Sequence, residues 1–543
     1  MAAHVPIPPT VTQFQRPGTR VFSSLEECAL SHSQAISLLA RCLHSCYGPA
    51  GGRKLLVTRP GCTMVVGSAR AFLPELQIEH PAGILAREAC HTQEQECGDG
   101  TNGVLQLASA MMAEAETLLR RGMLAPDLCI GYRLACAHAC RKLEELSISP
   151  WETWHHVDAA NPDELSTTVC EDTGYSLAST ISDELISQLL NGSLKGLVLG
   201  FTGGTLEDTS IFKGAILQME PLGTRMRVTD AQLALYVCPF GERRTRVAGT
   251  TLIEHAIEME KLRAGIERVE EERVEALRCA GVTVLAVAGA VSELALHFCN
   301  RAEILVVKLE RRSHARQLAL ASGAQALTTD RLSEHEELGQ CHQVYPSEIG
   351  GLPVMAFESC TGPRKGLITV VVRGSTPELV NYAVESVKAA LQLFKRLRED
   401  PRMVAGAGAV DIQLGIDLEK EGQKFPFLEK QGFLAFARAL ECLPHALADN
   451  WGLDVASVLR DLRARHRMGE TNVGVEENGT NPTKALDSFM VKKKALELAT
   501  DVAVTLIGSG TTLNLDSRSN GAQSPPPSSP CLAIKALGTM LPV

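Results

Sequence analysis

The chain has 543 residues, of which 45% are hydrophobic, 4% aromatic and 21% charged, as in an ordinary α/β multidomain protein. Its formal net charge of −10, without a long basic run, argues against nucleic acid and against an anionic membrane surface as the main partner. No stretch reaches the roughly 18 to 20 apolar residues that span a bilayer, and the first residues lack the apolar segment of a signal peptide. We therefore expect a cytoplasmic protein with 17 reduced cysteines.

The first part of the chain has mainly helical periodicity. Residues 1 to 20 are rich in proline and are expected to be loose. The pattern from Ser24 to Tyr47 then predicts a helix that stops at a glycine-rich turn. Beyond this turn the sequence predicts a short hairpin over residues 53 to 58 and 61 to 67, a helix over 83 to 96, and two helices over 102 to 147.

The segment Gly98-Asp99-Gly100-Thr101 lies between two of these helices and starts the second one. Its glycines allow a sharp backbone turn, and the free N–H groups of a helix start favour phosphate. Asp99 would repel phosphate directly, but its carboxylate suits a Mg²⁺ ion that bridges to the phosphate. Short segments of this composition are more often plain turns, so both interpretations stay open on these residues alone.

The middle of the chain alternates predicted strands and helices. This alternation is typical of an α/β domain with a parallel sheet and right-handed crossovers. Its longest helix is densely charged, which fits either a solvated face with i,i+4 ion pairs or a contact with another polypeptide. The predicted strands cover residues 198–201, 212–217, 233–237, 282–288, 304–309, 352–358 and 367–373, and the helices 254–280, 291–302 and 311–322.

The last part returns to helical periodicity. Pro377 to Asp400 predicts a long helix with proline in its first turn, and residues 404 to 507 predict further helices. Two helical halves around an α/β insert make a nested chain, whose ends return to one domain. After Gly508 the pattern weakens, and the residues from 523 to 530 predict a disordered tail rich in proline and serine.

One group of residues has the composition of a metal site. Cys136, His138 and Cys140 lie on a predicted helix, where the two cysteines share one face and the histidine lies on another. Three ligands cannot converge from these positions, so we expect small buried cysteines instead.

Four motifs resemble, in order and spacing, the nucleotide-site motifs of the group II chaperonin family. They are Tyr47-Gly48-Pro49, Glu79-His80-Pro81, Gly98-Asp99-Gly100-Thr101 and Val404-Ala405-Gly406-Ala407-Gly408-Ala409. The likeness covers about residues 1 to 507 and is strongest to the theta branch of the family, so we expect a theta-like paralogue. The residues that carry this finer likeness are His4-Val5-Pro6, Gln93-Glu94-Gln95-Glu96, Cys238-Pro239-Phe240 and Asn472-Val473-Gly474.

The resemblance implies the chaperonin architecture. In that architecture a helical equatorial domain from both chain ends binds ATP, a small intermediate domain acts as a hinge, and an inserted α/β apical domain holds unfolded polypeptide and carries a lid protrusion. Family members assemble as eight-membered stacked double rings. The implied divisions are equatorial 1–147, intermediate 148–212, apical 213–366, intermediate 367–403, equatorial 404–507 and a disordered tail 508–543.

The resemblance also implies which residues would form a nucleotide site. Its cofactors would be ATP and Mg²⁺, with Asp99 as the residue that holds the metal. The other implied residues are Tyr47, Gly48, Gly98, Gly100, Thr101, Asn102, Gly406, Gly408, Asp487 and Lys492.

The chain departs from the family pattern where the family activates water. Ser68 and Ala389 align with the two family carboxylates, and neither can deprotonate water. A general base contributes about 10² to 10⁴-fold in rate, so no intact catalytic residue is expected and turnover should be very slow. Glu385, one turn before Ala389, is an alternative carboxylate. Glu171-Asp172 replaces a family Ser-Lys, and Ala407 replaces a glycine, where a Cβ would crowd a positive φ.

These observations predict a chaperonin-type molecular chaperone that binds ATP and unfolded polypeptides with impaired hydrolysis. Its expected partners are polypeptide clients and other chaperonin subunits in a hetero-oligomeric double ring. Two alternatives stay open: a nucleotide-binding, hydrolytically silent scaffold or holdase, and a degenerate paralogue without an assembled role.

Overall fold

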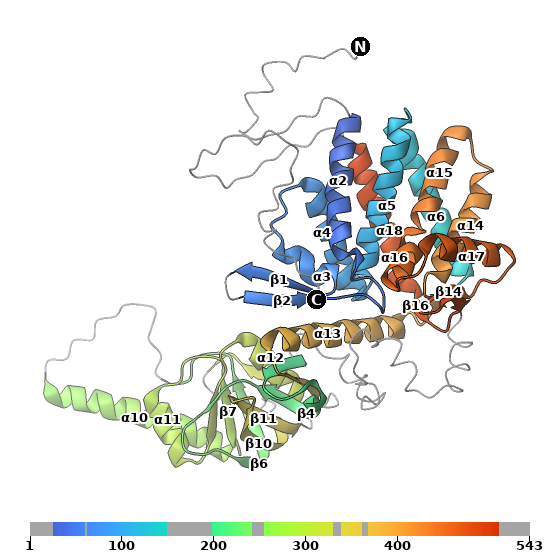
Figure 1. Ribbon diagram of the computed structural model, residues 1–543. Coiled ribbons are helices and arrows are strands. Elements are labelled where there is room, and N and C mark those ends of the chain that lie inside the picture. Colours follow the sequence, from blue (N-terminus) through green and yellow to red (C-terminus); the bar gives the residue numbers. More distant parts are fainter. Residues whose placement is uncertain are drawn as a thin grey trace, which may run out of the picture. The chain divides into compact units, whose positions relative to one another are not determined.

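The computed structural model describes residues 25–59, 62–148, 198–241, 255–329, 338–360 and 368–509. The chain divides into two compact units (Figure 1). Unit 1 consists of Met1–Ala178 and Gln392–Val543, and unit 2 of Ser179–Leu391. Both ends of the chain therefore contribute to unit 1, and the long helix α13 (Pro377–Glu399) continues from the sequence of unit 2 into that of unit 1.

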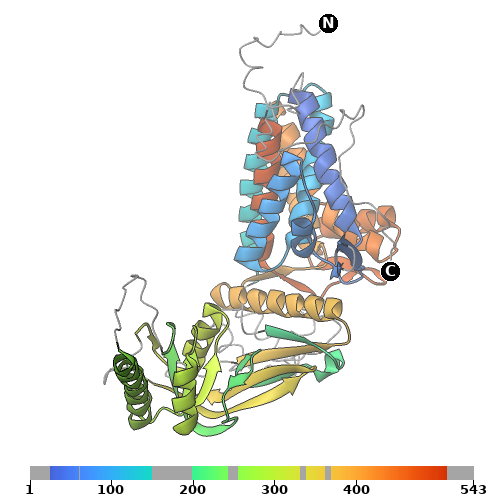
Figure 2. The ribbon, with the colours of Figure 1, turned by 90° about the vertical axis from the view of Figure 1, so that its left-hand side faces the viewer.

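Unit 1 is mainly a bundle of amphipathic helices. Its α5 (Thr101–Arg120) buries Val104, Leu107 and Met111, which are 1% exposed or less. Figures 1 and 2 show the blue helices of the first segment beside the red α18 of the second, and one hydrophobic core joins them. The other helices are α2 (Leu25–His44), α3 (Ala69–Phe72), α4 (Pro81–Cys97), α6 (Ala125–Glu145), α14 (Ala409–Gly422), α15 (Phe427–Ala439), α16 (Cys442–Asn450), α17 (Val455–Arg467) and α18 (Phe489–Gly508).

Three small antiparallel sheets complete the described part of unit 1. The first is a hairpin of β1 (Lys54–Arg59) and β2 (Cys62–Val66). The second pairs β13 (Met403–Ala405) with the distant β16 (Leu486–Ser488), and the third is the hairpin of β14 (Val473–Glu476) and β15 (Gly479–Pro482). The second and third sheets hold the glycine-rich loop that follows β13.

Unit 2 contains one large mixed sheet with the order β3-β12-β4-β11-β10-β6-β7-β8-β5, and β9 pairs with β6. Alternating apolar residues of its strands form the core, and helices α10 (Ala256–Cys279), α11 (Glu293–Arg301) and α12 (Arg312–Ser322) connect the strands from β6 to β9. The strands are β3 (Val198–Thr202), β4 (Ser210–Leu217), β5 (Pro221–Leu222), β6 (Val228–Tyr236), β7 (Val284–Val287), β8 (Leu305–Lys308), β9 (Ala326–Leu327), β10 (Gly339–Ile349), β11 (Leu352–Cys360) and β12 (Ile368–Gly374).

The predicted elements are mostly confirmed, but the expectation of a parallel sheet is wrong for part of it. β6, β7 and β8 are parallel, as expected for strands joined by helices. β10 and β11 instead form an antiparallel hairpin, because Gly350 and Gly351 adopt φ values of +62° and +76° in the tight turn between them. The expectation of helices throughout 404 to 507 is also wrong, since β14, β15 and β16 interrupt them.

Several expectations fall on residues outside the described ranges. They concern the first 20 residues, Glu171-Asp172 and the tail from 523 to 530. Within the described ranges, no helix combines the length and apolar character needed to cross a membrane.

Candidate functional site

The turn between α4 and α5 has a backbone shape that depends on glycine. Gly98 ends α4 with φ +80°, and its N–H donates to the Glu94 carbonyl at 2.8 Å. Gly100 precedes the first residue of α5 with φ +82° and offers no side-chain cap. A Cβ at Gly100 would stand 2.7 Å from Val491 Cγ1, so both conformation and space exclude a larger residue. The first N–H groups of α5 thus stay free of a side-chain cap.

Asp99 lies between these glycines and is fixed by the backbone. Its Oδ1 accepts from the Gly100 N–H at 2.6 Å, and its carbonyl accepts from Gln93 Nε2 at 2.9 Å. Gln93 is fully buried and also donates to the Val491 carbonyl at 3.2 Å, which ties the turn to α18. Desolvation by the surrounding loops raises the pKa of the Asp99 carboxyl and the Gly100 N–H lowers it, while the Asp487 carboxylate raises it further; the side chain is exposed to solvent, which weakens the effect of desolvation.

Asn102 connects this turn with two other loops. Its Oδ1 accepts from the Ala69 N–H at 2.6 Å, while its Nδ2 donates to the Gly67 carbonyl at 3.1 Å and the Cys46 carbonyl at 3.3 Å. The side chain is therefore engaged with backbone groups and positions the loops around it. Ser68, in the second of these loops, caps α3, since its hydroxyl accepts from the Ala71 N–H at 3.4 Å.

The Tyr47-Gly48 turn follows α2 and is held by a second asparagine. Asn450 Nδ2 donates to the carbonyls of His44 at 2.9 Å and Tyr47 at 2.7 Å. Gly48 has φ +82°, and a Cβ there would stand 2.4 Å from Leu447 Cδ2. The close approach of α16 therefore requires glycine at this position.

A second glycine turn, Gly406-Ala407-Gly408, connects β13 to α14. Gly406 N–H donates to the Ala485 carbonyl at 2.8 Å, and Gly408 precedes α14 with φ +77°. Ala407 adopts φ +52°, a conformation that an L-residue with a Cβ rarely takes. It is accommodated because Gly474 lies opposite, where a second Cβ would stand only 2.7 Å from Ala407 Cβ.

Lys492 on α18 joins two carboxylates from different elements. Its Nζ lies 2.8 Å from Asp411 Oδ2 on α14 and 3.3 Å from Asp487 Oδ2 on β16. Burial by itself would lower the pKa of Lys492, but both carboxylates raise it well above its ordinary value, so the side chain stays an ammonium. Asp411 is 1% exposed and was not singled out by the sequence; an acidic residue inside the apolar start of α14 was the signal available.

These groups lie within electrostatic range of one another. Desolvation raises the pKa of the Tyr47 hydroxyl, the Lys492 ammonium lowers it, and the Asp411 and Asp487 carboxylates raise it. Lys492 and Asp487 also act on Asp99. The structure therefore brings together the Tyr47 turn, the Gly98–Thr101 turn and the Lys492 cluster of Asp411, Asp487 and Lys492. Together with Asp99, this cluster contains three carboxylates and one ammonium.

The two positions on α13 that the sequence singled out, Glu385 and Ala389, belong to unit 2. Ala389 contributes only a methyl group, and Glu385 pairs with Lys388 Nζ at 2.8 Å. The family resemblance implies a water-activating carboxylate at position 68, in unit 1. This chain has Ser68 there, and its hydroxyl caps α3.

The cysteine and histidine side chains on α6 point in different directions, as predicted. Cys136 Sγ lies 3.9 Å from the Leu496 carbonyl on α18. His138 packs its ring against Phe425 and Phe433, with ring centroids 5.5 and 5.6 Å apart. The described residues contain no group of three or more histidine, cysteine, aspartate or glutamate side chains placed to hold a metal ion.

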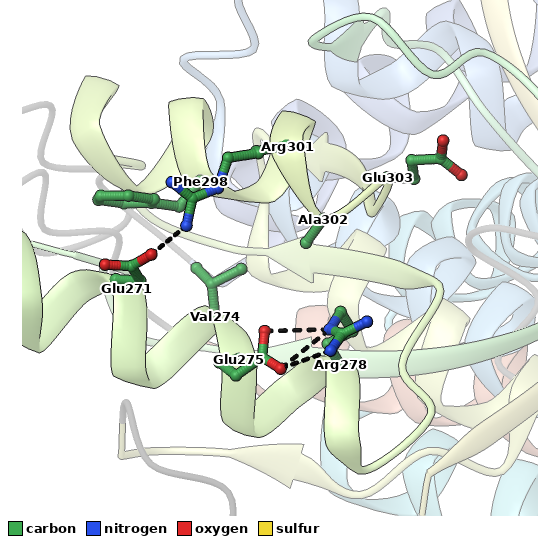
Figure 3. Close-up of a pocket in the computed structure, with 8 residues that line it drawn as sticks. All are labelled: Glu271, Val274, Glu275, Arg278, Phe298, Arg301, Ala302 and Glu303. Atoms are coloured by element: carbon green, nitrogen blue, oxygen red, sulfur yellow. Dashed lines mark hydrogen bonds and ion pairs between the residues drawn. The ribbon is translucent and has the colours of Figure 1, made fainter.

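Unit 2 has a groove of about 380 Å³ between α10 and α11 (Figure 3). Arg278 forms an ion pair with Glu275 at 2.6 Å, and Arg301 pairs with Glu271 across the groove. The Arg301 guanidinium also lies 5.0 Å above the ring of Phe298. The groove is therefore lined mainly by charged side chains, with Val274, Phe298 and Ala302 as its apolar residues.

The first half of α10 exposes apolar side chains as well as charges. Ile257, Met259 and Leu262 are 65%, 61% and 48% exposed, whereas Val274 and Leu277 near the other end are 2% exposed. Ion pairs such as Arg263–Glu267 at 3.3 Å occur on the same helix, so both interpretations of this charged segment have a structural counterpart.

Comparison with known proteins gives the class to which this fold and site belong. The sequence model of the TCP-1/cpn60 chaperonin family matches residues 39–513. The chain therefore belongs to the TCP-1/cpn60 chaperonin family, with the multidomain α/β chaperonin architecture.

Individual relatives indicate which branch of the family the chain resembles. T-complex protein 1 subunit theta from Mus musculus is 33% identical over 521 residues, which cover 93% of this chain and 95% of the relative. The protein of the same name from Homo sapiens gives the same values, and that from Caenorhabditis elegans is 29% identical over 507 residues, covering 91% and 92%. The predicted resemblance to group II chaperonins of the theta branch is confirmed.

Proposed function

We propose that this chain is a chaperonin-type molecular chaperone that binds ATP with Mg²⁺ in unit 1 and holds unfolded polypeptide in unit 2, with impaired hydrolysis. The observation that carries the proposal is that the Tyr47 turn, the Gly98–Thr101 turn and the Lys492 cluster lie together. A Cβ at Gly100 would stand 2.7 Å from Val491, the neighbour of Lys492, and Asn102 donates to the Cys46 carbonyl, next to Tyr47, at 3.3 Å. Family membership supports the chaperone class, and the site geometry supports the nucleotide.

The residues of unit 1 suit a Mg²⁺-nucleotide. The glycine positions matter most, because a Cβ at Gly98 would meet Gln392 and a Cβ at Gly100 would meet Val491, so only glycine keeps this turn in place before the first N–H groups of α5. Asp99 is the residue that would hold the metal, since a Mg²⁺ ion favours carboxylate oxygen and would also neutralise the excess of carboxylates. Thr101, Asn102, Gly406 and Gly408 would complete the cradle through backbone groups and the loops they fix.

Impaired hydrolysis follows from the side chains at 68 and 389. The Ser68 hydroxyl is used as a helix cap and is not basic enough to take a proton from water. Ala389 has no polar atom beyond its backbone. A site with these residues can bind a triphosphate without the group that activates the attacking water.

The groove between α10 and α11 is the proposed contact for unfolded clients. Its charged pairs and the exposed apolar residues of α10 allow segments of mixed composition to bind. We further propose incorporation beside other chaperonin subunits in a hetero-oligomeric double ring in the cytoplasm. Such a ring tolerates one silent member, because neighbouring subunits still hydrolyse ATP. The three-domain division stated above remains part of this proposal.

Single-turnover ATP hydrolysis, with nucleotide binding measured in parallel, tests the proposal. Wild-type protein should bind ATP and hydrolyse it negligibly, and the double variant Ser68→Asp, Ala389→Asp should gain turnover. Hydrolysis by the wild type at the rate of an active chaperonin would refute the impairment and direct attention to Glu385.

The alternatives differ in assembly and binding. A ring subunit should co-sediment in a particle much larger than the 58.4 kDa chain, whereas a silent holdase should bind clients without such a particle. A degenerate paralogue should show neither nucleotide binding nor client binding.

A further inference from the structure

Gln392 lies against the proposed phosphate turn. It is the first residue of the second segment of unit 1. A Cβ at Gly98 would stand 2.4 Å from Gln392 Cβ and 3.1 Å from Gln392 Oε1. Gly98 has a φ of +80°, which already favours glycine, and its lack of a side chain also leaves room for Gln392 to pack against the turn.

The protein leaves part of the Gln392 amide unsatisfied. Its Oε1 is buried and has no hydrogen-bond partner within the described ranges. A buried amide oxygen without a partner is unfavourable, and half a turn of the amide group places its NH₂ in the same space. In that orientation the side chain offers two N–H donors beside the Gly98–Thr101 turn.

The position of Gln392 on α13 gives this amide a particular role. Ala389 precedes it by three residues, so both lie on one helix face, and the lost carboxylate belongs to that face. The polar group that follows Ala389 on this face is the neutral amide of Gln392, whereas Ser386 and Glu385, which precede it, bond to the Tyr382 carbonyl and to Lys388. An amide can donate to a phosphate oxygen, but it cannot accept a proton from water as a carboxylate does.

The charges around the turn make a neutral donor useful. Asp99 and the two aspartates of the Lys492 cluster outnumber the ammonium of Lys492, which both of those aspartates already engage. The nearby cations Arg396 and Lys494 are paired with Glu399 and Glu96. The terminal phosphate of a triphosphate adds further negative charge. A donor that brings no charge of its own stabilises this phosphate without repelling it.

We propose that Gln392 recognises the terminal phosphate of a bound nucleoside triphosphate through its side-chain amide. The inference rests on the proposed nucleotide site in unit 1. Gln392 is then a specificity residue that distinguishes a triphosphate from a diphosphate, in a site that lacks the groups for rapid hydrolysis.

The test is equilibrium binding of ATP and of ADP to the full chain, with Mg²⁺ present, by isothermal titration calorimetry. Gln392→Met keeps the volume and removes the donors. It should weaken ATP binding roughly tenfold or more, the range for hydrogen bonds to charged groups, and change ADP binding less than about twofold. Gln392→Glu should weaken ATP binding at least as much, by charge repulsion. Gln423→Ala removes an exposed amide elsewhere in unit 1 and should change neither affinity.

Each outcome decides one of the two proposals. Suppose that the wild type binds both nucleotides. If Gln392→Met then lowers both affinities equally, or changes neither affinity, the role of Gln392 is refuted and the nucleotide site stands. If the folded wild type binds neither nucleotide, the site fails and the role of Gln392 fails with it. Thermal unfolding establishes whether each variant is folded. If Gln392→Met does not fold, Gln392→Glu provides the comparison with the wild type.

Discussion

Replacing Asn102 by alanine should loosen the loop that contains Ser68 without unfolding the bundle. The change removes one acceptor, which receives the Ala69 N–H at 2.6 Å, and one amide group, which donates to Gly67 and Cys46 at 3.1 and 3.3 Å. Each of these bonds contributes about 1 kcal/mol. Because Asn102 is only partly buried, water replaces some of them, and we expect a loss of about 2 kcal/mol in local stability.

Hydrogen–deuterium exchange measures this loss at the backbone amide of Ala69, whose N–H donates a hydrogen bond to Asn102 Oδ1. A change of about 2 kcal/mol corresponds to roughly 30-fold faster exchange through local opening. Asn450→Ala is the matched control, because Asn450 holds the Tyr47 turn through the carbonyls of His44 and Tyr47 and makes none of these contacts with Ala69. Exchange at Ala69 that stays within threefold of the wild type in Asn102→Ala would refute the reasoning.

Three further predictions concern the same site. Lys492→Met leaves Asp411 as a buried, uncompensated carboxylate and should cost about 3 to 5 kcal/mol, measured by thermal unfolding; a variant as stable as the wild type would contradict the buried ion pair. Since desolvation raises the pKa of Asp99 and Mg²⁺ needs its charged form, Mg²⁺-dependent nucleotide affinity should fall as the pH drops through that raised pKa, and Asp99→Asn should remove this dependence. Ala407→Gly relieves the φ of +52° and should stabilise unit 1 by up to about 1 kcal/mol in thermal unfolding, unless the loop changes conformation.

The sequence predicted the elements whose pattern is local. The amphipathic repeat of α5, the first hairpin and the glycine turn at Gly98 depend on spacing and on backbone conformation, and the structure has them where they were expected. The long strand β10 was missed, although Gly350-Gly351 is a strong signal for a two-residue hairpin turn. The strand after this turn was predicted over residues 352–358, but the residues before it are largely polar and include Pro346, which argues against a strand.

The parts of the site that were missed depend on tertiary contacts. β13 and β16 are each three residues long and exist because they pair with each other across the sequence of unit 1. Asp411 and Gln93 look like ordinary polar residues of helices until α18 places Lys492 and the Val491 carbonyl beside them. No local pattern specifies such partners, whereas a positive φ at Ala407 was foreseeable from the glycine motif it interrupts.

The proposed nucleotide site and the proposed loss of water activation depend on different residues of this chain. The turns rest on glycine conformations and on amides that bond to backbone groups, such as Gln93 and Asn102. Neither the Ser68 hydroxyl nor the Ala389 methyl group takes part in these contacts, and the Ser68 hydroxyl caps α3. Lys492 pairs with the buried Asp411 at 2.8 Å, and the loss of either partner would leave an uncompensated buried charge. The proposed silent nucleotide site needs such an intact buried pair, whereas a degenerate site does not.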